Sequence, residues 1–202
     1  MAATDRDIIY SILKYLGKVD LAETARTLER ESGMFFNVTY FEELVINGSF
    51  DEAEEYIGGF TTVHDNAYST KTIFEIRKQK FLEALENGER SAALNIVMDE
   101  FKTFEQYNAN LIPESTQLLT LDDFRSHGSL SEYGDMKKAR RTMVTEIRRF
   151  LEENPLLKGK LLYPAMNAGP PMLFKLVHNQ NADADPDHKL LYAKVDPFLR
   201  IN

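Results

Sequence analysis

The sequence predicts an all-α protein, a bundle of about nine helices. Apolar residues recur every three or four positions through most of the chain, which is the period of an amphipathic helix. Glycine, alone or after asparagine, follows several of these segments, as expected at helix ends. No segment shows the alternation of apolar and polar residues that predicts a half-buried strand. With 202 residues and 43% apolar composition, the chain can bury a sizeable core without a metal or disulfide.

Two short helices are predicted at the N-terminus. The first covers residues 5–16, and its apolar stripe holds Ile8, Ile9, Ile12, Leu13 and Leu16. Asp20 and Glu23 predict a capping box at the start of the second helix, which ends at Gly33. A unit of about 30 residues is too small to bury its own apolar faces. We therefore expect this pair of helices to dimerise with a second copy.

Four helices are predicted next. A short one covers 41–47 and ends at an Asn-Gly pair. Ser49 and Glu52 predict a capping box for the second, which ends at a Gly-Gly pair. Longer amphipathic helices are expected over 69–86 and 91–107, because apolar residues recur there at helical spacing.

The pattern then becomes irregular before one more strong helix. Pro113 interrupts the periodicity, and shorter helices are predicted over 115–121 and 122–127. A long helix is expected over 135–154, where Asp135 serves as its cap. The remaining segment, 165–202, is rich in turn-forming and polar residues and is predicted to be an irregular tail.

Composition argues against several classes of function. The net charge of −8 argues against a nucleic-acid binder, and no apolar run is long enough to span a membrane. The chain has no cysteine, and its four histidines lie in predicted loops or the tail without metal-ligand spacing. No phosphate-binding glycine loop or nucleophile motif is present either. We expect no catalytic residues, no metal and no cofactor.

A binding surface remains as the alternative to an active site. Seven apolar residues exceed what the inner helix stripes need: Phe74, Phe104, Leu111, Leu118, Phe124, Leu130 and Tyr133. Any one of them is more often a core residue than a ligand contact. Several, however, lie near Lys71, Lys78 and Arg140. An apolar groove with a cationic rim would suit a peptide that has leucines and acidic flanks.

Three stretches make the chain recognisable: LERESGMFFNVTYFEELVINGSFDEAEEYIGGFT, IFEIRKQKFLEAL and TQLLTLDDFR. They resemble the N-terminal domain of the Topless family of plant transcriptional corepressors, and the resemblance runs from about Ile8 to Pro164. It implies a LisH dimerisation motif over 4–36, a CTLH motif over 34–92 and a CRA-like helical region over 93–164.

The resemblance also implies a function. The family groove binds the LxLxL (EAR-type) repression motifs of transcription factors and repressors, and the family acts in the nucleus. The matching peptide-binding positions are Tyr68, Lys71, Phe74, Phe104, Leu111, Leu118, Leu130 and Tyr133. Lys78 and Arg140 would join Lys71 in holding the peptide backbone or its acidic flanks. Phe124 belongs to the same apolar set, and Phe150 stands at the groove edge in place of a usual leucine.

The oligomeric state implied is a dimer through LisH that pairs into a tetramer. Lys102, Thr116 and Gln117 match the positions that join one dimer to another. The family tail carries a zinc cluster of cysteine and histidine, and because this tail has no cysteine we predict no zinc. Two other functions stay open: a scaffold subunit of a ubiquitin-ligase-type assembly, as other LisH-CTLH chains are, or a truncated decoy relative of a corepressor.

Overall fold

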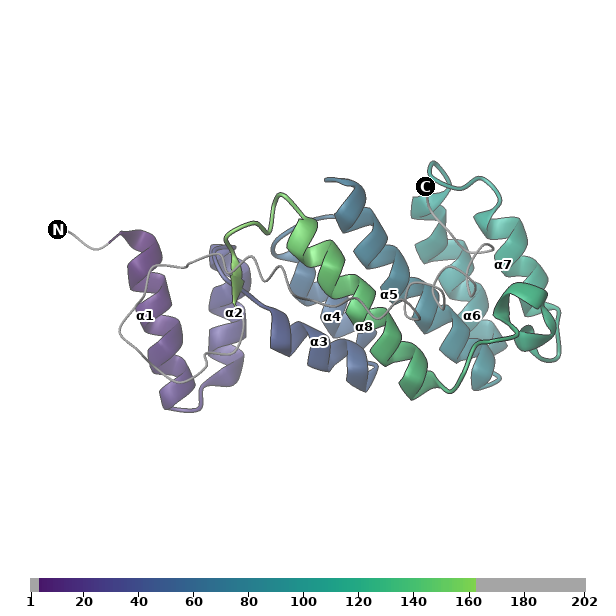
Figure 1. Cartoon of the computed structure of the whole chain (residues 1–202), viewed down its shortest axis with the longest axis horizontal. Coiled ribbons are helices and arrows are strands. Elements are labelled where there is room, and N and C mark those ends of the chain that lie inside the picture. The colour runs from purple at the N-terminus through teal and green to yellow at the C-terminus, as the bar shows by residue number, and fades with distance from the viewer. Residues whose placement is uncertain (1–3, 163–202) are drawn as a thin grey trace, which may run out of the picture.

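The computed structural model describes residues 4–162 and confirms the all-α prediction. The described residues form eight α-helices in an elongated row that runs from the α1–α2 hairpin to α6 and α7 (Figure 1). The helices are α1 (Asp5–Lys18), α2 (Ala22–Ser32), α3 (Val38–Asn47), α4 (Phe50–Gly58), α5 (Ala67–Glu86), α6 (Arg90–Asn95), α7 (Leu111–Leu119) and α8 (Met136–Glu153). The predicted tail at 165–202 lies outside the described residues.

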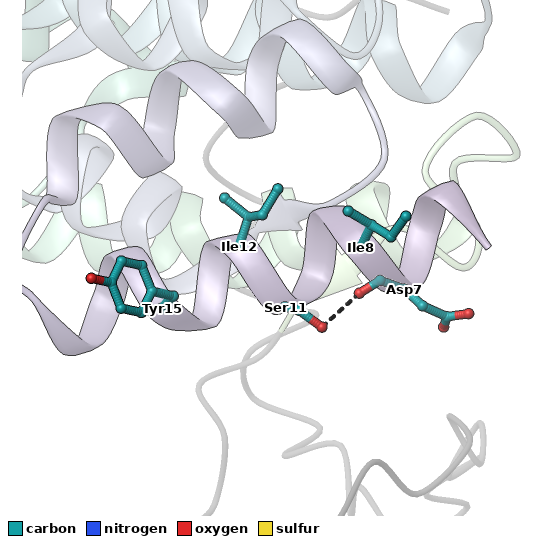
Figure 2. A pocket seen from close by; sticks show the side chains of 5 residues that line it. All are labelled: Asp7, Ile8, Ser11, Ile12 and Tyr15. Atoms are coloured by element: carbon teal, nitrogen blue, oxygen red, sulfur yellow. Dashed lines mark hydrogen bonds between the residues drawn. The ribbon is translucent and has the colours of Figure 1, made fainter. Parts of the chain in front are cut away.

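The capping of the N-terminal hairpin differs from the prediction. The capping box is at α1, where Thr4 accepts from the Asp7 amide and the Asp7 carboxylate accepts from the Thr4 amide. The box expected at Asp20 is wrong, because α2 begins after Leu21 and has no side-chain cap. Asp20 instead has a φ of 59° and turns the chain between the helices. Within α1, the Ser11 hydroxyl donates to the Asp7 carbonyl at 2.8 Å (Figure 2).

The hairpin has a small core of its own and is connected to the rest by a short strand pair. Leu13, Leu16, Ala25 and Phe35 make up this core. β1 (Phe36–Asn37) pairs in parallel with β2 (Leu161–Leu162), and the Phe36 amide donates to the Lys160 carbonyl at 2.8 Å. The sequence did not predict this pair, because two-residue strands are too short to show alternation.

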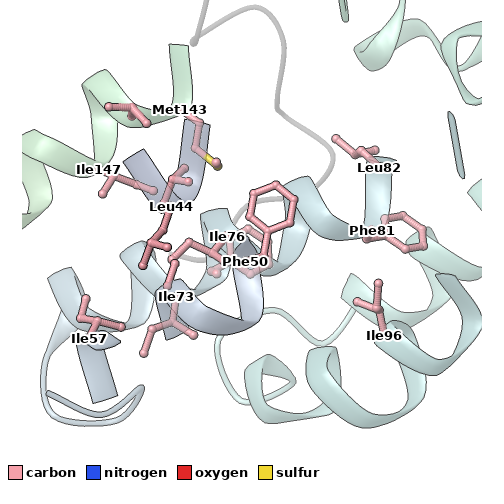
Figure 3. Packing of buried hydrophobic residues seen from close by; sticks show 14 of the residues in the cluster. Leu44, Phe50, Ile57, Ile73, Ile76, Phe81, Leu82, Ile96, Met143 and Ile147 are labelled. Carbon is pink, nitrogen blue, oxygen red and sulfur yellow. The ribbon is translucent and has the colours of Figure 1, made fainter. Parts of the chain in front are cut away.

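Much of the main core lies between α3, α4, α5 and α8 (Figure 3). Phe41, Ile57, Ile76 and Ile147, one from each of these helices, are all fully buried. The predicted starts and ends of these helices are largely confirmed. Gly48 ends α3 with a φ of 82°, and the Asp135 side chain accepts from the Lys138 amide at the start of α8. Ser49 is the N-cap of α4, but its side chain makes no capping hydrogen bond.

The helix predicted over 91–107 is broken into three parts. After α6 come a π-helical turn, Ile96–Glu100, and a 3-10 turn, Phe101–Phe104. Arg77 from α5 donates to the Glu100 carbonyl at 3.0 Å, so this carbonyl has a side-chain partner where the regular helix ends.

The two remaining corrections concern the segment before α8. Pro113 does not interrupt a helix, because it lies in the first turn of α7, where amide groups have no intrahelical partner. The helix predicted over 122–127 is only a 3-10 turn, Phe124–Ser126, followed by a second one, Gly128–Leu130.

Candidate interaction surfaces

The outer face of α1 is an exposed apolar surface. Ile8, Ile12 and Tyr15 are 48%, 41% and 63% exposed. Together with Asp7 and Ser11 they line a concavity of about 370 Å³, and all five side chains belong to this one helix (Figure 2). Burying such a face against another surface would be favourable, since each square ångström of apolar area removed from water contributes roughly 25 cal/mol.

The residues predicted to form one apolar stripe on α1 lie on two different faces of the helix. Leu13 and Leu16 point toward α2 and are 9% and 8% exposed, so they stabilise the hairpin itself. Ile9 is partly buried against the same small core. Leu13 and Leu16 therefore have a role within one chain, and their assignment to an oligomer contact stays a prediction. The sequence reasoning also missed Tyr15, which extends the outer face by one turn beyond Ile12.

The three residues proposed to join dimers are all exposed. Lys102 lies on the 3-10 turn after α6, and Thr116 and Gln117 lie on α7, which packs beside that turn. Thr116 uses its hydroxyl within α7, where it donates to the Ile112 carbonyl at 2.8 Å.

The residues proposed to bind a peptide come from five parts of the chain. Helix α5 carries Tyr68, Lys71, Phe74 and Lys78, and the turn after α6 carries Phe104. Helix α7 carries Leu111 and Leu118, and the segment between α7 and α8 carries Phe124, Leu130 and Tyr133. Helix α8 carries Arg140 and Phe150. The structure brings seven of these residues, all except Tyr68, Phe150 and the three cations, into one cluster within the main core. The Phe74 ring lies 5.1 Å from that of Phe104, and Phe124 lies 5.2 Å from Tyr133.

These seven side chains are packed inside rather than exposed on a groove floor. Their exposed fractions range from 0% for Phe104, Leu111 and Leu118 to 7% for Tyr133. The expectation of an open apolar trench is therefore wrong for this conformation, and the alternative interpretation as core residues describes their positions. Residues this well buried stabilise the fold by dispersion and by the hydrophobic effect.

Two of the three predicted rim cations are already paired with carboxylates. The Lys78 ammonium lies 2.8 Å from Glu75 and is nearly buried, at 7% exposed. Arg140 donates from Nε and Nη2 to the two carboxylate oxygens of Glu83 at 2.7 and 2.5 Å. Lys78 and Arg140 thus already have partners within the fold, and their contact with a peptide stays a prediction. Lys71 is half-buried and has no ion pair among residues 4–162.

A buried polar network connects α5 to the segment before α8. Gln79 donates through Nε2 to Glu83 and to the Tyr133 hydroxyl, at 2.8 and 2.7 Å. Burial raises the pKa of Tyr133 to about 12. Sequence reasoning missed Gln79 and Glu83, whose only signal was their place as polar residues on the inner side of a long helix.

The accessible part of the proposed peptide site lies on the seam between α5 and α8. Tyr68, Lys71 and Phe150 are each partly exposed. The two helices run antiparallel, because Asn154 at the end of α8 donates to Ser69 near the start of α5, at 2.9 Å. Phe150, one turn before Asn154, therefore lies beside the first turns of α5.

Metal ligation and membrane insertion find no support in the described part of the chain. Within residues 4–162 no three histidine, aspartate or glutamate side chains converge to hold a metal ion. None of the described helices has the length and apolar composition that crossing a membrane requires. The prediction that the tail lacks zinc concerns residues outside this range.

Comparison with known protein families identifies the class to which this fold belongs. The family model of the TPR1-like, CTLH-containing domain matches residues 37–161, which extend from β1 to the start of β2. The chain is 48% identical over 168 residues to Protein TPR3 of Oryza sativa subsp. japonica and 47% identical over 166 residues to Protein TOPLESS of Arabidopsis thaliana. This chain belongs to the Topless family and corresponds to its N-terminal domain.

The matches cover most of this chain and little of the relatives. They include 83% of the chain for Protein TPR3 and 82% for Protein TOPLESS, but the chain spans only about 15% of the length of either relative. Topless-related protein 2 of Arabidopsis thaliana matches in the same way, with 46% identity over 168 residues.

Proposed function

We propose that this chain is the self-associating, peptide-binding adaptor domain of a transcriptional corepressor that acts in the nucleus. The family match carries the proposal, because residues 37–161 contain every position proposed to contact a peptide. No catalytic role is proposed for any residue. The proposed division of the chain is LisH over 4–36, CTLH over 34–92 and CRA-like over 93–164.

The proposed ligand is a short LxLxL (EAR-type) repression motif. Its leucines would contact the buried apolar cluster that holds Phe74 and Leu111, and Lys71 would supply a cation to peptide carbonyls or acidic residues. Because Phe74, Leu111 and the other apolar members are buried, a leucine can reach them only if their packing opens. Part of the binding free energy would be used for this opening, so the affinity of one site would be moderate.

Self-association would compensate for moderate affinity at one site. A second copy packed on the outer face of α1 would cover Ile8 and Ile12, and Lys102, Thr116 and Gln117 would join two such dimers. A partner that carries two motifs would then bind with an effective concentration near the millimolar range for its second motif.

Titration of a fluorescent LxLxL peptide tests the proposed ligand. We expect saturable binding with a dissociation constant below about 100 μM, and loss of binding for a peptide whose three leucines are replaced by alanine. Equal signals from the two peptides, or no saturation at all, would contradict the proposal. Stable capture of neighbouring subunits without any peptide binding would favour the scaffold alternative.

A further inference from the structure

The first turns of α8 carry three exposed cations that have no ion-pair partner in the described part of the chain. Lys137, Lys138 and Arg141 are exposed, and no ion pair or side-chain hydrogen bond of theirs is described within residues 4–162. At 3.6 residues per turn these three positions fall within an arc of about 100° on one side of the helix.

Most other cations on α5 and α8 are paired with carboxylates, although Lys71 on α5 is not paired within the described residues. On α5, Arg77, Lys78 and Lys80 each pair with one or two carboxylates. Further along α8, Arg148 pairs with Glu42, and Arg149 pairs with Glu146. The start of α8 is thus a concentration of unpaired positive charge in a chain whose net charge is −8.

This arrangement is unfavourable for the isolated helix. Cations in the first turns of a helix oppose the helix dipole, and like charges four residues apart, as at Lys137 and Arg141, repel each other. Apart from its cap Asp135, α8 has no acidic residue in its first turn to offset them. Positions where a sequence works against its own local structure are often functional. An anionic partner would remove both penalties at once.

The position of this basic patch indicates which anion it meets. Leu130 and Tyr133, which belong to the proposed peptide site, directly precede α8, and Arg140 lies next to Arg141 with its guanidinium held by Glu83. A peptide that lies along the proposed site and leaves it at the Leu130–Tyr133 end would reach Lys137 and Lys138. A block of acidic residues beside the leucine motif is therefore the occupant whose charge and position match.

We propose that Lys137, Lys138 and Arg141 bind an acidic segment that flanks the leucine motif of the partner peptide. This inference rests on the proposed function. It assigns recognition of the flank to these three residues in place of Lys78 and Arg140, whose charges are already paired. A nucleic acid is the less favoured anion, because three phosphate contacts on an acidic chain give only weak binding.

The test compares labelled LxLxL peptides that carry three glutamates, before or after the leucines, with versions that carry three glutamines. At low salt, we expect one of the two glutamate peptides to bind the unmodified chain about tenfold more tightly than its glutamine version, as three exposed ion pairs allow. The preference should fall to about twofold or less near 1 M salt, where screening is nearly complete. The triple variant K137Q/K138Q/R141Q should lose the preference and keep the affinity for the glutamine peptides.

A matched control removes three other exposed cations, in the variant K14Q/K18Q/K158Q, and should keep the tenfold preference. If the α8 variant keeps it too, the inference is wrong although the proposed function stands. If neither class of peptide binds the unmodified chain, the proposed function fails and the inference fails with it. Binding of a 20-base-pair duplex that depends on the three α8 cations, without any glutamate preference, would assign the patch to nucleic acid and overturn the proposal.

Discussion

Replacing Arg140 by methionine tests whether this residue stabilises the fold or is available to bind a ligand. Glu83 is 7% exposed and receives two charged hydrogen bonds from Arg140, so the substitution leaves a buried carboxylate with Gln79 as its described hydrogen-bond donor. Removing one partner of a buried ion pair lowers the free energy of unfolding by about 3–5 kcal/mol. Because the Arg140 side chain is 18% exposed, we expect a value near the lower end, about 3 kcal/mol.

Urea unfolding followed by circular dichroism measures this free energy. The matched control is Arg149→Met, which breaks a pair with Glu146 whose arginine is 56% exposed and should cost less than about 0.5 kcal/mol. The double variant E83Q/R140M removes both charges and should recover part of the loss. A loss of under about 1 kcal/mol for R140M would refute the reasoning and return Arg140 to the residues available for a peptide.

Three further predictions concern the core, the outer face of α1 and the buried phenol. Phe74→Ala should destabilise the fold by about 3–5 kcal/mol and abolish peptide binding, whereas Phe74→Leu should keep the fold; thermal unfolding and peptide titration measure the two effects. Ile8→Glu with Ile12→Glu should lower the oligomer mass in light scattering and leave the helical circular dichroism near native; an unchanged mass would exclude this face as the contact. The pKa of Tyr133 is raised from 10.0 to about 12 in the folded protein. The neutral phenol therefore contributes fully to the stability of the fold below pH 10, and this contribution is lost as the pH rises through 12. Tyr133→Phe should therefore reduce the alkaline loss of stability by about 2–3 kcal/mol, and urea unfolding at pH 8.5 to 11 should show the onset of this difference.

Local signals in the sequence were sufficient for most of the fold. Gly33 and Gly48 end α2 and α3 with positive φ, and Asp135 caps α8, because such ends depend on a few neighbouring residues. The break after α6 could not be predicted, since it involves a contact between Arg77 and the Glu100 carbonyl that arises only when two helices pack.

The candidate site was predicted less well than the fold, for a physical reason. Spacing places Phe74 and Leu111 on inner faces, but it does not tell whether such a face meets another helix or water. The structure answers that both are buried. In the same way, the charge of Arg140 is evident from the sequence, whereas its pairing with Glu83 requires the antiparallel packing of α5 and α8.

The strand pair between Phe36 and Leu161 fixes the orientation of the N-terminal hairpin relative to the helices of the main core. Arg6 adds to this attachment, since its guanidinium donates both to the Met34 carbonyl and to the Gly159 carbonyl. Residues more than 120 positions apart in the chain therefore fix the angle at which α1 projects from the body. If two copies meet through α1, this junction sets the distance and direction between their peptide sites, so a change at Arg6 would alter which spacing of repeated motifs a paired molecule can span.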